Sequence, residues 1–312
     1  MTAIPVFAAR HVEAAVSPAE AVEAVRDAFI AYAREEWTMP PKVYAPAYPA
    51  GDFRAMPALG GGYALLKWVT SFPGNPARGL PTVTGLVLLS DAETGTLRAV
   101  LDAAAVTALR TGAAAVLAAE TLGRPGGTAA VVGAGVNGVA TARTFIARGH
   151  RVSLWDVDEA RAHTAAGELG ADVARSREDA LAADVVVTVT PGREVLFPVG
   201  SLRPGQHVSL MGADGPGKAE IAPEELARVR VFCDDWEQAS HNGDLVHAVE
   251  AGHLSRSDVT ELGAVLAGDA AGRKNDEDVT AFDSTGLAIQ DLAIALAALE
   301  RADELDLRML DL

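Results

Sequence analysis

The sequence predicts an α/β protein whose main domain is a doubly wound parallel sheet. Two observations predict it. From residue 128 onward, short apolar runs alternate with helical stretches, and regular alternation of this kind is typical of parallel strands with helices on both faces. A glycine-rich turn, residues 133–138, follows the first of these runs and opens a helix. At roughly 150 residues per domain, a chain of 312 residues has room for about two domains.

The composition excludes several classes of protein. A hydrophobic fraction of 49% is enough for a large core and excludes a disordered chain. The formal charge of -16, from 26 Lys and Arg against 42 Asp and Glu, disfavours nucleic acid and anionic membranes as partners. The sequence has a single cysteine, Cys233, so we expect no internal disulfide, no cysteine metal cluster and a cytoplasmic location.

Targeting, membrane and metal signals are also not found in the sequence. Residues 1–10 lack a basic segment followed by a long apolar core, so we expect no secretory signal. No window approaches 18 consecutive apolar residues, so we expect no membrane span. The seven histidines show no spacing typical of zinc ligands, and we expect no metal site.

The first 124 residues predict two helices and an antiparallel sheet. Residues 17–35 carry apolar side chains at helical spacing, with Ser17 as the N-cap and Pro18 in the first turn. An alanine-rich helix is predicted at residues 103–122, and Arg124-Pro-Gly-Gly127 predicts a domain boundary. Between the helices lie short strand-like runs broken by proline and glycine, at residues 44–48, 53–56, 63–69, 82–90 and 97–101.

The strand and helix alternation continues to residue 286. A helix is predicted at residues 139–147, directly after the glycine turn. A last helix, residues 287–299, follows the loop Asp283-Ser-Thr-Gly286, and we expect it to pack back on the N-terminal part. The predicted domains are therefore residues 1–124 with 287–312, and residues 125–286. The buried parallel strands are predicted at residues 128–132, 152–155, 184–190, 207–211 and 229–233.

The glycine turn predicts a dinucleotide site. Gly133-Ala-Gly135-Val-Asn-Gly138 has the GxGxxG spacing between a strand and a helix, and Asp156 ends the next predicted strand. The glycines allow a tight turn and a close approach of the pyrophosphate to N–H groups at the helix start. Asp156 is expected to bind the adenosine ribose and to repel a 2′-phosphate, and Trp155, Val157 and Asp158 offer no basic pocket. NAD(H) is therefore preferred, and an ordinary glycine turn is the less favoured alternative.

Three basic residues, Lys42, Lys67 and Arg110, lie beside a strand or turn in the N-terminal half. Lys67 lies within an apolar run, where an unpaired ammonium would be costly, so it needs a carboxylate partner or a ligand. The alternative is a strand residue that faces solvent. Arg110, on an alanine-rich helix, is equally well explained as a surface charge.

Asp214 follows the predicted strand at residues 207–211. Ligands of doubly wound sheets bind outside the carboxyl ends of the strands, so this carboxylate is placed to reach the nicotinamide end of the site. The alternative is an aspartate that forms a turn before glycine and proline. His241 and His247, with Asp244 between them, are interpreted as solvated positions near a helix start.

The chain resembles the ornithine cyclodeaminase/mu-crystallin family in a series of motifs that occur in the same order along nearly its whole length. This resemblance implies a discontinuous N-terminal substrate and dimerisation domain, completed by the C-terminal helix, with a Rossmann domain between its two parts. It also implies a homodimer. The matching segments are Met56-Pro57-Ala58, Lys67-Trp-Val, Phe72-Pro-Gly-Asn75-Pro, Gly79-Leu-Pro81, residues 91–95, Asp102-Ala103, and residues 107–112, 133–138, 212–218 and 283–291.

The resemblance also implies roles for the candidate residues. Lys67 matches the family's active-site lysine near the substrate carboxylate, Arg110 matches its carboxylate-binding arginine, and Asp214 matches the acid/base at the reacting amino group. Lys42 stands where an arginine is common, and a lysine supplies the charge without the bidentate fork. Arg54 occupies the position of the glutamate that takes the side-chain amine of ornithine, so a diamine would be repelled.

The implied chemistry is hydride transfer from an amino-acid Cα to NAD+, with Asp214 accepting a proton from the amino group. We therefore expect an NAD(H)-dependent oxidoreductase that acts on the Cα–N bond of a small L-amino acid or of the corresponding imine, as alanine dehydrogenases and ketimine reductases of the family do. Ornithine cyclodeaminase is the first alternative, and a mu-crystallin-like NAD(P)H-dependent binder of a small carboxylate is the second. The expected coenzyme contacts are Arg110, Thr111, Gly133, Gly135, Val136, Asn137, Gly138, Asp156, Thr190, Gly212 and Asp214.

Overall fold

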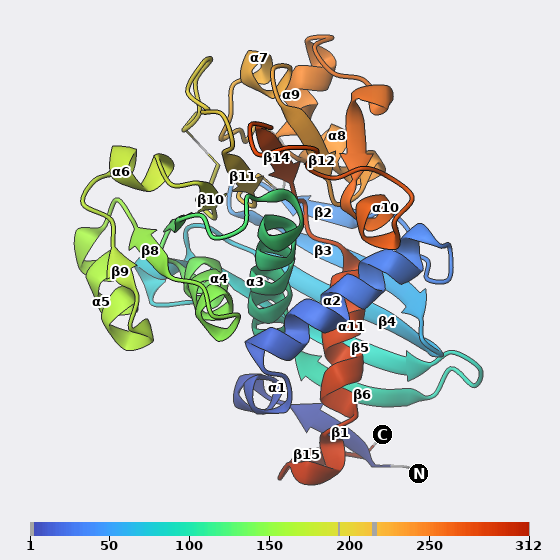
Figure 1. Ribbon diagram of the computed structural model, residues 1–312. Coiled ribbons are helices and arrows are strands. Elements are labelled where there is room, and N and C mark those ends of the chain that lie inside the picture. Colours follow the sequence, from blue (N-terminus) through green and yellow to red (C-terminus); the bar gives the residue numbers. More distant parts are fainter. Residues whose placement is uncertain (1–2, 193, 214–216, 312) are drawn as a thin grey trace. The chain divides into compact units, whose positions relative to one another are not determined.

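A computed structural model describes residues 3–192, 194–213 and 217–311 (Figure 1). The chain forms two compact units, residues 1–110 with 287–312, and residues 111–286. The first unit is discontinuous, and the second begins within the helix α3 (Ala103–Leu122). The domain boundary predicted after residue 124 would instead leave the whole of α3 in the first domain, and it stays a prediction.

The first unit contains a seven-stranded sheet with the strand order β15-β1-β6-β5-β4-β3-β2. Neighbouring strands are antiparallel except β1 and β6, which are parallel, so the predicted antiparallel sheet is in fact mixed. The two short strands β1 and β15 were not predicted. The strands are β1 (Ile4–Phe7), β2 (Val43–Ala47), β3 (Gly51–Gly60), β4 (Tyr63–Ser71), β5 (Val83–Asp91), β6 (Leu97–Asp102) and β15 (Arg308–Leu310).

Helices α2 (Pro18–Ala33) and α11 (Ala288–Leu299) lie across this sheet (Figure 1). Ser17 caps α2 as predicted, because its side chain accepts the N–H of Glu20. Helix α11 packs on α2 and on strands β3, β4 and β5. The prediction that the last helix returns to the N-terminal part is therefore confirmed. A short helix, α1 (Ala9–Ala15), precedes α2.

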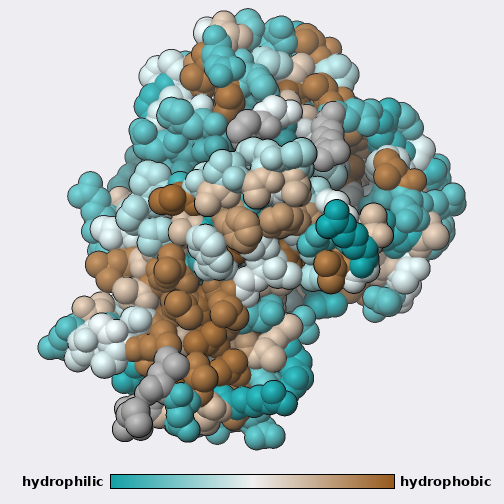
Figure 2. All heavy atoms as spheres, turned by 180° about the vertical axis from the view of Figure 1, so that it is seen from behind, coloured by the Kyte–Doolittle hydropathy of each residue, from teal (hydrophilic) through white to brown (hydrophobic). Residues whose placement is uncertain are grey.

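The two faces of this sheet differ in exposure. Residues that alternate toward the helices, such as Met56, Leu65 and Val87, are buried. On the other face, Leu66, Trp68 and Leu86 are 39%, 45% and 51% exposed. Figure 2 shows hydrophobic side chains gathered on the face seen from behind, over the strands of this sheet.

The second unit contains an eight-stranded sheet in which all strand pairs are parallel. Its order is β13-β12-β14-β11-β10-β7-β8-β9, which confirms the predicted doubly wound sheet. Strand β14 lies between β11 and β12 and was not predicted, because Thr280 and Asp283 leave only Ala281 and Phe282 as its apolar residues. The strands are β7 (Ala129–Val132), β8 (Val152–Trp155), β9 (Asp172–Val173), β10 (Val185–Thr188), β11 (His207–Leu210), β12 (Arg230–Cys233), β13 (Val259–Glu261) and β14 (Thr280–Asp283).

The helices of this unit are mostly short apart from α3. Helix α3 is long and apolar enough to cross a membrane, but 67% of its most apolar window is buried inside the protein, as in a core helix. The others are α4 (Val136–Ala147), α5 (Glu159–Leu169), α6 (Arg177–Leu181), α7 (Pro223–Leu226), α8 (Trp236–Asn242), α9 (Leu245–Glu250) and α10 (Leu262–Ala267).

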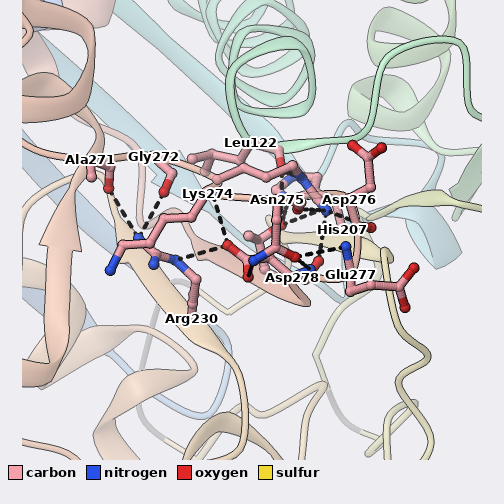
Figure 3. A network of polar contacts seen from close by, with 12 residues as sticks. Leu122, His207, Arg230, Ala271, Gly272, Lys274, Asn275, Asp276, Glu277 and Asp278 are labelled. Atoms are coloured by element: carbon pink, nitrogen blue, oxygen red, sulfur yellow. Dashed lines mark hydrogen bonds and ion pairs between the residues drawn. The ribbon is translucent and has the colours of Figure 1, made fainter.

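A polar network closes the amino-terminal edge of the parallel sheet. The guanidinium of Arg273 donates to the carbonyl oxygens of Leu122 at 2.7 Å, Asp278 at 2.7 Å and Gly205 at 3.1 Å. Arg230 donates to the carbonyl of Gly272 at 2.7 Å. Figure 3 shows the loop of residues 271–278 folded around these contacts. The loop before β14 is therefore tied to the end of α3 and to the loop before β11.

Replacing Arg273 with alanine is expected to destabilise the second unit by about 2–3 kcal/mol, because several carbonyl oxygens lose a charged donor. Urea unfolding followed by circular dichroism measures this as a lower midpoint. Arg151→Ala is the control, since Arg151 forms an exposed ion pair with Asp172, and its change should stay below about 0.5 kcal/mol. Equal midpoints for Arg273→Ala and the wild type would contradict the assigned role.

Candidate functional site

The glycine turn joins β7 to α4 in the predicted way. Gly133 has a φ of +108°, and its N–H donates to the carbonyl of Trp155 at 2.7 Å. Helix α4 begins at Val136, three residues earlier than predicted, so Gly138 lies in its first turn. A Cβ on Gly138 would lie 1.8 Å from the carbonyl oxygen of Gly133, whereas a Cβ on Gly135 would meet no atom within 4 Å. Gly138 is thus needed for packing, and Gly135 leaves the outer side of the turn open.

Asp156 directly follows β8 and is buried. Its Oδ2 accepts the N–H of Ala134 at 2.7 Å, and its Oδ1 accepts the N–H of Asp158 at 2.8 Å. A carboxylate has about four lone-pair sites, so each oxygen retains room for a further donor such as a ribose hydroxyl. The carboxylate also fastens the glycine turn to the end of the neighbouring strand.

The structure corrects the expectation that no basic residue lies beside Asp156. Arg161, in the first turn of α5, places Nη1 at 3.8 Å from Oδ1 of Asp156 and Nη2 at 3.4 Å from Oδ2 of Asp158. Arg161 is not an immediate sequence neighbour of Asp156, and only the start of α5 brings it there. A cavity of ≈ 360 Å³ opens beside these groups, and it is lined by Ala134, Val139, Asp158, Ala160, Arg161, Thr164, Ala165 and Glu168.

A buried carboxylate joins two candidate residues at the carboxyl ends of the central strands. Glu220 accepts the hydroxyl of Thr188 at 2.5 Å, the hydroxyl of Thr190, and the N–H of Gly212 at 3.3 Å. Burial raises the pKa of Glu220. The structure therefore brings Thr190 and Gly212 together, through a residue that sequence reasoning missed.

The remaining predicted coenzyme contacts differ in their exposure. Val136 is 74% exposed at the start of α4, and Asn137 is half-buried. Thr111 is buried in α3, and its hydroxyl has no hydrogen-bond partner among the described residues. Asp214 lies outside the described residues, so the position of the predicted acid/base is not assigned.

Lys67 lies in β4 on the face that packs against α11. It is paired in register with Met56 of β3 and Val87 of β5, and it is 1% exposed. Its Nζ donates to Oδ1 of Asp291 at 2.8 Å. The carboxylate partner required by the sequence analysis is therefore present, and the solvent-facing alternative is wrong. Burial lowers the pKa of Lys67 to about 8, although the charge of Asp291 opposes this change.

Arg110 is held beside the same carboxylate. Its Nη1 donates to Oε1 of Gln290 at 3.3 Å, and its Nε lies 3.8 Å from Oδ1 of Asp291. The side chain is 12% exposed, so the interpretation of Arg110 as a surface charge is wrong. The first unit thus brings Lys67 and Arg110 together at the start of α11.

Arg54 lies on the same face of the sheet, opposite Val69 and therefore two residues along β4 from Lys67. Its Nε and Nη2 donate to the carboxylate of Asp52 at 2.6 Å and 3.2 Å, and its guanidinium lies 5.3 Å from the ring centre of Tyr44. Asp52 therefore balances the charge of Arg54. Lys42 is half-buried and stands directly before β2.

The histidines of α8 and α9 differ from the prediction in part. His241 is exposed, as predicted, but His247 is half-buried, and its Nε2 lies 3.2 Å from the carbonyl oxygen of Lys218. Asp244 is buried rather than solvated, and it accepts the N–H of Glu220. Within the described ranges, no group of three or more His, Cys, Asp or Glu residues is arranged to hold a metal ion.

Asp291 and Gln290 are the residues of this site that the sequence analysis left without a role. A signal for Asp291 was available, since it is the one charged residue in the helix Ala288–Leu299, whose other residues except Gln290 are apolar. A lysine in an apolar strand and an aspartate in an apolar helix each need a partner of opposite charge. Lys67 and Asp291 are 224 residues apart in the sequence, so their pairing follows only from the packing of the helix on the sheet.

Comparisons with known proteins identify the family. The model of the ornithine cyclodeaminase/mu-crystallin family matches residues 5–305. The chain belongs to this family. Curated relatives include an alanine dehydrogenase of Archaeoglobus fulgidus (42% identical; 94% of this chain, 93% of the relative), an iminosuccinate reductase of Paracoccus denitrificans (33%; 95% and 96%) and an ornithine cyclodeaminase of Agrobacterium tumefaciens (34%; 78% and 70%).

Solved structures of family members are similar over the full length. An archaeal alanine dehydrogenase dimer with bound NAD has a TM-score of 0.93 at 39% identity, covering 99% of each chain. The iminosuccinate reductase of Paracoccus denitrificans in complex with NAD+ has a TM-score of 0.90 at 30% identity, covering 100% of each chain. The Rossmann-type sheet and the discontinuous first unit are therefore those of the family fold.

Gly138→Ala and Gly135→Ala form a matched pair that tests the two glycine roles. The Gly138→Ala variant is expected to lower stability by about 2 kcal/mol or more, because its methyl group would overlap the Gly133 carbonyl oxygen and force the turn apart. Gly135→Ala should change stability by less than about 0.5 kcal/mol, since that position is open. Thermal unfolding of the two variants measures the difference, and equal midpoints would show that the turn tolerates the methyl group.

Proposed function

We propose that this protein is an NAD(H)-dependent oxidoreductase that acts on the Cα–N bond of a small L-amino acid or of the corresponding imine. The observation that carries the proposal is the buried pair of cations, Lys67 and Arg110, around one carboxylate. Together with a nucleotide-binding turn, this arrangement suits a substrate that carries one carboxylate and reacts with a nicotinamide coenzyme. The likeness to alanine dehydrogenase and iminosuccinate reductase supports the same conclusion.

The residues of the second unit fit the coenzyme. Gly135 leaves open space where the pyrophosphate would approach, and the first N–H groups of a helix such as α4 have no acceptor within the helix and suit an anion. The free lone pairs of Asp156 suit the ribose hydroxyls. The cavity beside them is lined by two carboxylates, Asp158 and Glu168, and by one cation, Arg161, which disfavours a 2′-phosphate. When bound, the coenzyme supplies the hydride acceptor or donor.

The residues of the first unit would bind and orient the substrate. An ammonium has three N–H donors, and one of those of Lys67 is used by Asp291. The others, together with the guanidinium of Arg110, suit the substrate carboxylate. Fixing that carboxylate restricts the orientation of Cα and its hydrogen, which is the main contribution of such a clamp to the rate. Asp214 is proposed, by the family resemblance, to accept the proton of the substrate amino group.

Ornithine cyclodeamination is the second candidate function. One observation, the ion pair between Arg54 and Asp52, weakens the expectation from the sequence that a diamine is excluded. From the sequence, Arg54 is expected to repel a diamine. Because Asp52 holds Arg54 in a two-bond ion pair, the net charge at this position is close to zero and the repulsion is weaker than a lone arginine would give. The likeness to ornithine cyclodeaminase is consistent with this alternative.

We also propose that the protein is a cytoplasmic homodimer that associates through the outer face of the seven-stranded sheet. This face exposes Leu66, Trp68 and Leu86 (Figure 2), and a contiguous apolar surface of this kind is typical of a protein interface. The structure of the archaeal alanine dehydrogenase is that of a dimer, which favours a second copy of the chain as the partner.

The function is tested by mixing the purified protein with NAD+ and a panel of amino acids: alanine, ornithine, lysine, arginine, proline, aspartate and glutamate. NADH absorbance and released ammonia are followed separately. We expect NADH and ammonia to accumulate together with one small amino acid, because a net dehydrogenase forms both. Ammonia from a diamine without net NADH would instead identify a cyclodeaminase, and coenzyme binding without either product would contradict the proposal.

The pKa of Lys67 predicts how carboxylate binding depends on pH. Below about pH 8 the buried ammonium is charged, and as the pH rises through this value it loses its proton. The Kd of a 2-oxo acid inhibitor, which has no titrating amine, should therefore rise by up to about tenfold per pH unit above 8. Inhibition measured from pH 6.5 to 9.5 checks this, with Lys67→Met as the control that should show no such rise. A flat profile in the wild type would contradict it.

A further inference from the structure

The first turn of α11 supplies a partner to each of the two buried cations. Asp291 accepts Nζ of Lys67 at 2.8 Å, and Gln290 accepts Nη1 of Arg110 at 3.3 Å. Both acceptors are fully buried. Two adjacent residues of one helix thus contact β4 and α3, which are otherwise far apart in the sequence.

The hydrogen bonds also determine which way Gln290 points. Its Oε1 accepts both Arg110 and the N–H of Leu287, so Nε2 is the donor that remains. Nε2 of Gln290, Nε of Arg110 and Oδ2 of Asp291 are buried and have no hydrogen-bond partner within the described part of the chain. Buried polar atoms without partners are costly and uncommon. Two of these atoms, Nε of Arg110 and Nε2 of Gln290, are donors that an anion would satisfy, whereas Oδ2 of Asp291 is an acceptor that needs a further donor.

The charge balance of the cluster leads to the same ligand. Lys67 and Arg110 contribute two positive charges, and Asp291 contributes one negative charge, which leaves a net charge of about +1 in a buried region. Arg54 on β3 also faces Lys67, and its charge is balanced by Asp52. One monoanionic carboxylate would neutralise the cluster.

We propose that Asp291 and Gln290 are positioning residues, which hold Lys67 and Arg110 together as a clamp for a single substrate carboxylate. The inference rests on the proposed function for the identity of the ligand. Asp291 keeps two like charges adjacent, and Gln290 orients the guanidinium toward it. The charge of Asp291 raises the pKa of Lys67. If that charge is removed, the remaining influences, which are burial and the charges of Arg110 and Arg54, all favour loss of the Lys67 proton.

The first test replaces Asp291 with asparagine, which keeps the shape and removes the charge. At pH 8, KM for the amino acid should rise at least about fivefold, because a fall of one unit in the pKa of Lys67, from about 8, reduces its charged fraction from about one half to about one tenth. The Kd for NADH should stay within about twofold, since the expected coenzyme contacts other than Arg110 belong to the other unit. Asp303→Asn, an exposed change in the first unit, is the control and should leave KM unaltered. An unchanged KM in Asp291→Asn would overturn the inference.

A second readout does not depend on turnover. The sequence has four lysines, Lys42, Lys67, Lys218 and Lys274, so their side-chain signals in a protein labelled with [ε-13C]lysine can be resolved by NMR. Loss of one signal in Lys67→Met assigns Lys67. Its titration midpoint should lie near pH 8 in the wild type and at least about one unit lower in Asp291→Asn. The same midpoint in both proteins would overturn the role of Asp291. Absence of turnover in the wild type would instead contradict the proposed function.

Two further variants keep the test decisive if Asp291→Asn does not fold. Asp291→Glu retains the charge and displaces the carboxylate, so the Lys67 midpoint should stay within about half a unit while KM rises several-fold. Gln290→Met removes the acceptor of Arg110, so KM should rise about tenfold and kcat should fall, because the substrate is oriented less well, while the Lys67 midpoint stays unchanged. A wild-type KM in both variants would overturn the positioning role.

Discussion

The buried ion pair between Lys67 and Asp291 is the contact on which the first unit depends. It joins the middle of the mixed sheet to the C-terminal helix across 224 residues of chain. Breaking such a pair by removing one partner commonly costs about 3–5 kcal/mol, because the other charge stays buried. The pair adds to the packing of α11 on α2 and the pairing of β1 with β15, which also join the two chain segments, and it explains why α11 carries a charge.

The second unit uses carboxylates in a different way. Asp156 and Glu220 accept N–H and O–H donors from the last residue of β10 and from loops that follow neighbouring strands, and so they shape those loops without an ion pair as short as that of Lys67. In a doubly wound sheet the ligand binds at this edge. The opposite edge is closed by Arg273 and its carbonyl acceptors. One edge of the sheet is thus rigidly fastened, and the other presents backbone groups to a ligand.

The balance of charges in the first unit bears on both the proposed carboxylate site at Lys67 and Arg110 and the proposed position of the substrate side chain at Arg54. Asp52 neutralises Arg54, whereas Asp291 neutralises only one of the two cations beside it. The same sheet face therefore has one position that is close to neutral and one with an unbalanced positive charge. The unbalanced position suits a carboxylate, which all the proposed substrates share, and the neutral position is where their side chains can differ.

The sequence by itself determined the doubly wound sheet, the turn at residues 133–138, the place of Asp156 after a strand and the need of Lys67 for a partner, because these depend on local spacing and on the cost of burying one charge. Only the tertiary structure decided which residues form hydrogen bonds and ion pairs with the candidate site residues. Asp291, Gln290, Asp52 and Glu220 became visible only when distant elements met, and β14 was found only through its neighbours in the sheet. Local periodicity reports which face of an element is buried, but the partner of a buried charge depends on which elements pack together.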